Sequence, residues 1–438
     1  MIDYDLNERG SVSLYEYLYQ RIRDDILSGS IVAGEHLPSK RGLAQHLGIS
    51  VITVEGAYDQ LVAEGFVRSA PRRGYFANEL PRAATVPRLK DAADRDAGSV
   101  APGRAFVPVS DLPKTSLDGS RLWQRALKTV LASESERELF APAPAQGTAR
   151  LRRAIAAHLR GSRGMDVDPE AIVIGAGAQL LDTMLVQLLG REKTYAVEDP
   201  GYLRLTRIYQ ACGCDVCHIP LDAEGPDLHK LEKSGVDVLH LMPSLQFPTG
   251  RVTSIARRYA LLGWASQRSG RYLIEDDFDC EFRLAGKPIP PLTAIDAPGC
   301  VIYTNTFSKS LSSALRLAYM VLPDRLMERY RQELGFYAST VSSIDQIVLA
   351  HLLETGEYVR LEGADAGLHA VLAIETDLDE RELLRVLGMP TGCVSALADH
   401  LWCAEHGVDD GIRHLVVQYL MLEKEMGGEL AEKLRTIL

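Results

Sequence analysis

Apolar residues recur with the period of an α-helix in three short stretches near the start of the chain. The first stretch, opened by the capping-box pattern Ser13-x-x-Glu16, carries an apolar residue at every fourth position, namely Leu14, Leu18, Ile22 and Ile26. This spacing predicts an amphipathic helix that ends at Gly29. A second helix is predicted to begin at Ser39 and to end at Gly48, and a third to begin at Ser50. Two short helices joined by a glycine-containing turn are typical of a helix-turn-helix unit.

The segment after the third helix has the pattern of a β-hairpin. FVRSAPRRGYFAN, residues 66–78, consists of two short β-rich runs around a Pro-Arg-Arg-Gly turn. Three helices followed by a basic hairpin predict a winged helix in residues 1–77. Residues 78–104 lack an apolar period and are rich in proline, alanine and charge, which predicts a flexible linker.

From residue 105 to residue 438, strand and helix patterns alternate along the chain. Such alternation predicts an α/β domain with a mostly parallel sheet. Three predicted strands run directly into chemically distinctive loops: AIVIGAG into a glycine turn, RYLIEDDF into a run of acids, and VIYTNTF into a loop that contains Lys309. The carboxyl ends of parallel strands share one edge of the sheet, where the ligand sites of α/β domains form.

The composition is that of an ordinary globular protein and narrows the choice of partners. The chain is 46% hydrophobic and 24% charged, and its net charge of −11 provides no chain-wide positive field for nucleic acid. Any contact with DNA must therefore come from a local basic patch. The polar start and the lack of a long apolar run predict a cytoplasmic protein without a signal peptide or membrane span. The odd count of seven cysteines fits free thiols.

One cysteine cluster has the spacing of a haem-attachment or metal site. It contains Cys214-x-x-Cys217-His218, with Cys212 as an additional candidate ligand. No matching second pair of ligands lies nearby in the sequence, and the stretch also has the pattern of a strand, where cysteine acts as a small apolar residue. We therefore interpret it as a core strand and predict no metal site.

The N-terminal string from LYEYLYQRIRDDILSG to RSAPRRGYF resembles the GntR-type winged helix from end to end. The resemblance implies double-stranded DNA as a partner. By position it implies these DNA-contacting residues: Ser39, Lys40 and Arg41 at the start of the second helix, Ser50 and Thr53 at the start of the recognition helix, and Arg72 and Arg73 on the wing. The chain departs from that family at Val51 and Ile52, where polar or basic residues are usual. Apolar side chains contact thymine methyl groups but cannot bond bidentately to guanine, so the departure concerns the operator sequence.

The glycine turn, the acidic strand end and the lysine loop together favour a site for a phosphorylated aldehyde with a ring nitrogen. Pyridoxal 5'-phosphate (PLP) needs a lysine amine, a carboxylate beside its pyridine nitrogen and anion donors for its phosphate. The helix that follows AIVIGAG supplies such donors at its N-terminus.

Residues 105–438 resemble a fold-type I aminotransferase domain, and nearly the whole chain resembles the MocR/GabR family of transcriptional regulators. The motifs that carry the resemblance are GAGAQ, EDPGY, PSLQFPTG, IEDDFDCEF and TFSKSL with LRLAYM. By position it implies these cofactor-binding residues: Lys309 in the internal aldimine, Asp276 at the pyridine nitrogen, Tyr202 stacked on the ring, and Ser308, Arg316, Gly177, Ala178 and Gln179 at the phosphate. It also implies that Arg204 contacts an effector and that the protein is a homodimer.

The chain departs from this family at the cofactor and at the substrate side. Phe278 replaces a usual tyrosine, and Leu245 a usual histidine or asparagine, both near the phenolic oxygen of PLP. Losing two hydrogen bonds of about 1.5–3 kcal/mol each weakens binding on the order of 100-fold or more. Met421 stands where an arginine is expected. After Arg360 a basic helix and the start of a strand are missing, either by a true deletion or because this sequence lacks them, and this puts the small C-terminal subdomain in question.

Two classes of function fit these features. As a regulator, the protein senses an amine or amino acid, or PLP itself, through the Lys309 aldimine and passes the signal to its DNA-binding domain. As an enzyme, it is an aminotransferase with an appended DNA-binding domain. The winged helix and the altered site favour the regulator, so we predict no steady turnover and assign no catalytic residue. Phe278 and Leu245 also leave open a structural dimer without cofactor.

Overall fold

The structure is a computed structural model of the 438-residue chain. It describes residues 4, 6, 14–63, 66–70, 73–78, 119–278, 290–307, 310–311, 314–358, 369–374, 378–388, 394–402, 412–418, 430 and 433. The chain divides into two compact units, residues 1–85 with 253–267 and residues 86–252 with 268–438. The predicted linker lies outside the described residues from residue 79 to its end, so the domain boundaries at 77 and 104 stay predictions.

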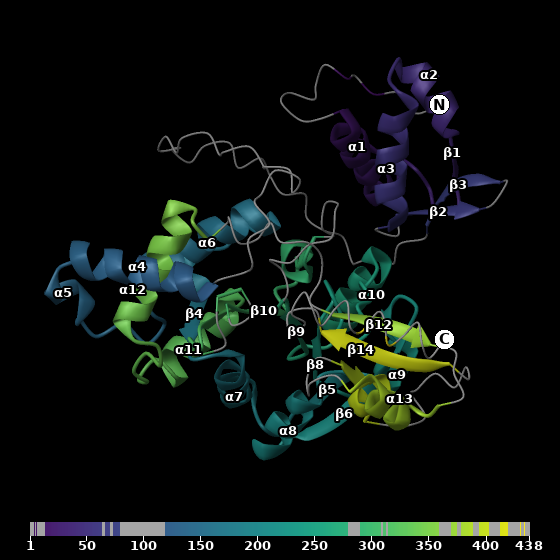
Figure 1. The fold of residues 1–438 in the computed structure, drawn as a ribbon. Coiled ribbons are helices and arrows are strands. Elements are labelled where there is room, and N and C mark those ends of the chain that lie inside the picture. The colour runs from purple at the N-terminus through teal and green to yellow at the C-terminus, as the bar shows by residue number, and fades with distance from the viewer. Residues whose placement is uncertain are drawn as a thin grey trace. The chain divides into compact units, whose positions relative to one another are not determined.

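The N-terminal segment folds as the predicted three helices and hairpin. These elements are α1 (Leu14–Ser28), α2 (Lys40–Leu47), α3 (Val51–Ala63), β1 (His36–Leu37), β2 (Val67–Ala70) and β3 (Gly74–Ala77). Three residues of the predicted apolar stripe of α1 are buried, with Leu18 and Ile22 fully inaccessible and Ile26 7% exposed, whereas Leu14 is half-buried. Helix α1 lies beside α3 (Figure 1). The strands form an antiparallel sheet in the order β1-β3-β2. Strand β1 was not predicted, because two residues are too few to show a period.

The remaining chain is built around one large, mostly parallel sheet combined with helices, as predicted. Its strands are β4 (Ile172–Gly175), β5 (Thr194–Asp199), β6 (Asp215–Asp222), β7 (Gly225–Pro226), β8 (Val238–Leu241), β9 (Tyr272–Asp276), β10 (Val301–Thr306) and β11 (Ala318–Val321). The connecting helices and turns are α4 (Gly119–Ser133), α5 (Glu136–Leu139), α6 (Ala149–Arg163), η3 (Pro169–Ala171), α7 (Ala178–Leu189), α8 (Leu203–Ala211), α9 (Leu228–Ser234), η4 (Leu292–Ile295), α11 (Asp324–Glu333) and α12 (Ser343–Thr355). Helix α10 (Ile255–Ser266) follows β8 in the sequence and belongs to the first unit.

The eight strands lie in the order β4-β11-β10-β9-β8-β5-β6-β7. The central neighbours from β10 to β6 pair in parallel, whereas β11 is antiparallel to both of its neighbours and β7 is antiparallel to β6. The sheet is therefore mostly parallel, and β5, β8, β9 and β10 end at one edge.

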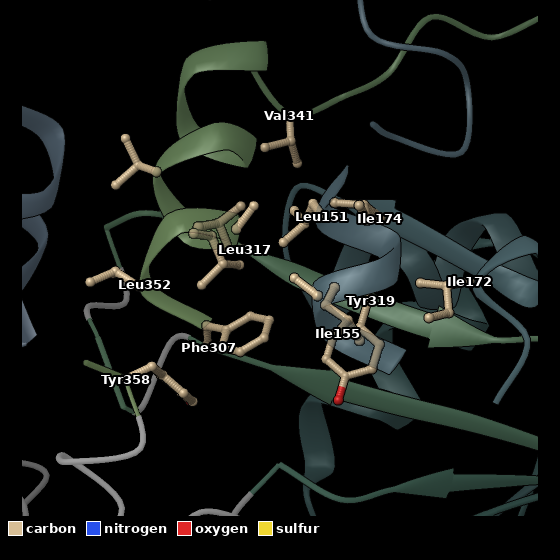
Figure 2. Close-up of a cluster of buried hydrophobic side chains, with 14 of the residues drawn as sticks. Leu151, Ile155, Ile172, Ile174, Phe307, Leu317, Tyr319, Val341, Leu352 and Tyr358 are labelled. Atoms are coloured by element: carbon tan, nitrogen blue, oxygen red, sulfur yellow. The ribbon is translucent and has the colours of Figure 1, made fainter. Parts of the chain in front are cut away.

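Hydrophobic cores cover both faces of this sheet. In β4, Ile172 and Ile174 belong to one core and Val173 to the other, because successive strand residues point to opposite faces. Figure 2 shows part of the first core, in which Ile155 of α6 and Leu352 of α12 gather with the sheet residue Tyr319. This packing fixes the sheet edge from which the site is built.

A small C-terminal subdomain is present, although the sequence put it in question. It contains β12 (His369–Ile374), α13 (Glu380–Leu387), β13 (Val394–Ala396), η5 (Leu397–His400) and β14 (Arg413–Gln418), with strand order β12-β14-β13. Its own core includes Leu383, Leu387 and Leu415, all fully buried. Residues 359–368, which include the position of the expected gap after Arg360, lie outside the described residues, and so does Met421. Among the described helices, none has the length and apolar character to cross a membrane.

Candidate functional site

The glycine turn between β4 and α7 presents a helix N-terminus to the carboxyl edge of the sheet. Gly177 caps α7 with φ 91° and ψ 157°, a conformation open essentially to glycine alone. The cap provides no side-chain hydrogen bond to the first turn, where Ala178 and Gln179 lie. A helix start without a side-chain cap, with its dipole pointing outward, is suited to bind an anion.

Arg316 lies directly over this turn. A Cβ atom placed on Gly177 would be 2.3 Å from Nη2 of Arg316 and 2.6 Å from its Cζ. Arg316 itself has φ 51°, and among the described residues it is the non-glycine residue with a positive φ. Strain of this kind persists where the surrounding structure holds it, and it concentrates at ligand sites. The structure thus brings together Gly177, its helix start and Arg316 in a geometry that fits a phosphate group, and their assignment as phosphate ligands stays a prediction.

Asp276 ends strand β9 and faces His240 of the neighbouring strand β8. Oδ2 of Asp276 is 3.7 Å from Nε2 of His240, long for a hydrogen bond but close for electrostatic attraction. The other ring nitrogen, Nδ1, lies 2.6 Å from the hydroxyl of Tyr209. Burial lowers the pKa of His240, but Asp276, Asp182 and Glu198 raise it more, so the net pKa lies above the usual value. A protonated His240 would attract the Asp276 carboxylate, which is the group that the resemblance places at the pyridine nitrogen.

Two further acids are buried near this pair. Asp182 lies on α7 and Glu198 on β5, and both are about 95% or more buried. Burial raises the pKa of Asp182 to about 7, opposed by His240, and burial raises the pKa of Glu198 to about 7, opposed by hydrogen bonds from Met242 and Gln246. Sequence reasoning missed Asp182, His240 and Glu198. Their sequence signal was a charged or titratable residue inside an apolar helix or strand pattern.

The strand end that carries Asp276 is held by a buried ion pair. Nη2 of Arg163 lies 2.6 Å from Oδ2 of Asp277, and the hydroxyl of Tyr303 donates to the same oxygen at 2.8 Å. Both charged side chains are 2% exposed or less, so breaking the pair leaves a buried charge. The ion pair at Asp277 therefore also fixes the position of the adjacent Asp276.

Tyr202 is the N-cap residue of helix α8 and is 36% exposed. Burial of its ring raises the pKa of the phenol, whereas nearby Arg204 and a hydrogen bond from Gln179 oppose the rise. Arg204 is exposed, with its guanidinium carbon 5.6 Å from the centroid of the Tyr202 ring. The edge of Phe247 also contacts this ring, at a centroid distance of 6.1 Å. Tyr202, Arg204 and Gln179 thus lie close together, and their roles towards cofactor and effector stay predictions.

Lys309 and Ser308 lie outside the described residues, so their predicted roles stay predictions. Their neighbours are placed: β10 ends at Thr306, and Thr304 of β10 pairs in register with Asp276. The segment 308–309 therefore follows the strand next to Asp276. Leu245 and Phe278 are half-buried, and Phe278 packs against the core.

The predicted DNA-contacting residues lie at the starts of α2 and α3 and on the hairpin. Ser39 caps α2 by accepting a hydrogen bond from the Gly42 amide, and Arg41 in its first turn is exposed. Lys40 donates to Glu55 at 2.8 Å and to Asp59 at 3.2 Å. Further residues are placed as follows: Ser50 and Thr53 share a 2.8 Å hydrogen bond at the start of α3, and Arg73 is exposed on the hairpin. Arg72 lies outside the described residues.

The cysteine cluster forms no metal centre among the residues that the structure describes. Cys217 lies in strand β6, as the strand interpretation predicted, but is half-buried, and Cys212 and the buried Cys214 precede the strand. The ring of His218 stacks on Trp402 at 4.5 Å and its Nε2 lies 2.9 Å from the hydroxyl of Thr206. His218 is thus a packing residue that joins β6 to the C-terminal subdomain.

Comparisons with known proteins match both parts of the chain. Residues 14–76 match the family described as "Bacterial regulatory proteins, gntR family", and residues 114–368 match "Aminotransferase class I and II". The uncharacterized HTH-type transcriptional regulator YhdI of Bacillus subtilis is 37% identical over 399 residues, which cover 88% of this chain and 83% of the relative. The probable rhizopine catabolism regulatory protein MocR of Rhizobium meliloti is 29% identical over 369 residues, 81% of this chain and 74% of the relative.

A solved structure gives the same fold for the larger part of the chain. An archaeal alanine:glyoxylate aminotransferase superposes with a TM-score of 0.61 at 21% identity, covering 74% of this chain and 88% of the other. At this identity the likeness shows the fold alone, which is the fold-type I aminotransferase fold. The chain therefore belongs to the MocR/GabR family of HTH-type transcriptional regulators, in which a GntR-type DNA-binding domain precedes an aminotransferase class I and II domain.

Proposed function

We propose that this regulator binds PLP in its aminotransferase-like domain and changes its affinity for DNA when an amine or amino acid reaches the cofactor. The observation that carries the proposal is the turn where Gly177 leaves room for the Arg316 guanidinium above the uncapped start of α7. Such a site suits a doubly charged phosphate.

Three groups of residues would hold the cofactor. Gly177, Ala178, Gln179 and Arg316, with Ser308, would bind the phosphate. Asp276, with His240 beside it, would bind the pyridine nitrogen, and Tyr202 would cover one face of the ring. Bound PLP supplies a carbonyl carbon that exchanges between the Lys309 amine and an incoming amine.

The effector would enter beside Tyr202. Arg204 is an exposed cation on this side, and a guanidinium fork matches a carboxylate. The C-terminal subdomain reaches the same loop, because the Gly201 amide donates to the His400 carbonyl at 3.0 Å and the Trp402 amide to Asp199 at 2.8 Å. A ligand at Tyr202 therefore acts on contacts between large and small subdomains. We further propose a cytoplasmic homodimer as the working form.

The experiment is a spectrum of purified protein with PLP, followed by a turnover assay. Wild type should show the visible band of lysine-bound PLP, borohydride should abolish this band, and Lys309→Ala should lack it. Incubation with amino donors and a 2-oxo acid should then give little or no multiple turnover. Identical spectra for wild type and variant would refute the cofactor assignment, and many turnovers with any donor would identify the protein as a working aminotransferase.

A further inference from the structure

The hydroxyl groups of Ser50 and Thr53, at the start of the recognition helix α3, form hydrogen bonds within the helix cap. The Thr53 amide donates to the Ser50 hydroxyl at 3.1 Å, and the two hydroxyls lie 2.8 Å apart. A capping hydroxyl satisfies an amide that would otherwise lack a partner, so moving it to a base edge costs the cap. Ser50 and Thr53 are therefore poorly placed to read bases.

The side chains that project outward at this turn are apolar. Ile52 is 79% exposed and Val51 is 41% exposed. A single exposed hydrophobic residue needs no explanation. Here two adjacent ones occupy the N-terminal turn of the second helix of a helix-turn-helix, and residues at this turn contact base edges in the major groove.

The acids on the same helix are neutralised from α2. Glu55 and Asp59 are largely exposed, and phosphates would repel them, but Nζ of Lys40 donates to both, at 2.8 and 3.2 Å. The same ammonium lies 5.4 Å from the centroid of the Tyr75 ring on β3. The hydrogen bond to Glu55 raises the pKa of Lys40, so this amine stays charged at any physiological pH. Lys40 is thereby directed at Glu55 and Asp59 of α3.

We propose that the recognition helix reads its operator chiefly through thymine methyl groups, which Ile52 and Val51 contact, and that Lys40 serves DNA binding indirectly by neutralising Glu55 and Asp59. The inference rests on the proposed DNA-binding function and specifies how the sequence is read. Thymine alone among the four bases presents a methyl group in the major groove.

Removing one contacted methyl should weaken binding about fourfold, because burial of a CH₂-sized group is worth about 0.8 kcal/mol. The operator is first obtained by selecting bound duplexes from a randomised pool with the full-length protein. Each thymine is then replaced by uracil, which removes the methyl and leaves every hydrogen-bonding group in place. At one or two positions in each half-site we expect the loss of about fourfold in affinity.

A second substitution separates methyl reading from hydrogen-bond reading. At the sensitive positions, the thymine–adenine pair is replaced by cytosine–guanine or by 5-methylcytosine–guanine. The protein should bind the operator with 5-methylcytosine more tightly, because this base presents a methyl group in the major groove on a different hydrogen-bonding pattern. The variant Ile52→Ala should bind the thymine and uracil operators equally at the position it reads. Val51→Ala serves as the matched comparison for the neighbouring position.

The outcomes distinguish this inference from the proposed function. If the protein selects a specific duplex but uracil has no effect at any position, methyl reading is wrong and the DNA-binding function stands. If no specific duplex is selected at all, both fall. An unchanged affinity and specificity of Ile52→Ala would also overturn the inference, since an exposed side chain that serves another partner leaves the operator complex unaltered.

The role of Lys40 is tested by rescue. Lys40→Met should weaken operator binding at least tenfold, because Glu55 and Asp59 then face the phosphates without a partner. Adding Glu55→Gln and Asp59→Asn to this variant should restore most of the affinity. If the triple variant stays as weak as Lys40→Met, Lys40 contacts a phosphate itself and the indirect role is refuted. Circular dichroism of each variant checks that the domain is folded.

Discussion

Replacement of Gly177 by alanine tests the phosphate site most sharply, because the new atom has a defined position. The added Cβ would lie 2.3 Å from Nη2 of Arg316, far inside van der Waals contact, so the guanidinium must move. At φ 91° and ψ 157° an alanine also strains the backbone, at a cost of about 1–3 kcal/mol. We therefore expect both a less stable protein and a damaged anion site.

The loss of cofactor affinity follows from the displaced guanidinium. A hydrogen bond to a charged group contributes about 1.5–3 kcal/mol, so PLP should bind about 10- to 150-fold more weakly to Gly177→Ala. The matched control is Gly164→Ala, since Gly164 also has a positive φ of 65° but its Cβ would meet no atom within 4 Å. That variant should lose some stability and keep its PLP affinity. Titration with PLP, followed by absorbance, measures both, and wild-type affinity in Gly177→Ala would contradict the phosphate assignment.

Three further predictions concern the buried acid, the effector and the DNA. Burial raises the pKa of Asp182 from 3.8 to about 7, so between about pH 4 and pH 7 the folded state keeps a proton that the unfolded state has lost. The free energy of unfolding should fall as pH rises through this window, and it should fall less for Asp182→Asn, as measured by urea unfolding at each pH. If the free energies of wild type and variant change in parallel with pH, Asp182 is not protonated in the folded state. Arg204→Ala should reduce the response of DNA binding to the effector while the visible band of bound PLP persists, and loss of the band instead would assign Arg204 to the cofactor. Arg41→Ala should abolish site-specific retardation in a gel-shift assay with the fold intact; unchanged retardation would exclude Arg41 from the interface.

The sequence predicted the elements well where a period or a cap was present. The apolar stripe of α1 and the glycine that ends α2 match the structure, because local periodicity and capping decide these features. The glycine turn of α7 and the acidic end of β9 were found from strand ends, since a parallel sheet brings those ends to one edge, whereas Asp276 itself was assigned through the resemblance. The two-residue strand β1 was not found, because it exists only through its pairing with β3.

The side-chain partnerships could not be predicted in the same way. The resemblance implied that Lys40 contacts DNA, but it could not show that this amine pairs with acids 15 and 19 positions later. Likewise, His240 and Asp182 read as isolated polar residues in apolar segments, and their proximity to Asp276 depends on how β8, β9 and α7 pack. Contacts between segments that are distant in the sequence can be identified only once the three-dimensional fold is known.

The central claim is that an amine at the Lys309 cofactor changes affinity for DNA. The direct measurement is the dissociation constant of a selected, labelled operator by fluorescence anisotropy, for PLP-loaded wild type and Lys309→Ala, with and without each of a panel of amines and amino acids. With at least one amine, wild type should shift about 5- to 150-fold, the usual range of allosteric coupling, and Lys309→Ala should not respond. An equal shift in Lys309→Ala, or no shift in wild type with any amine, would contradict the claim.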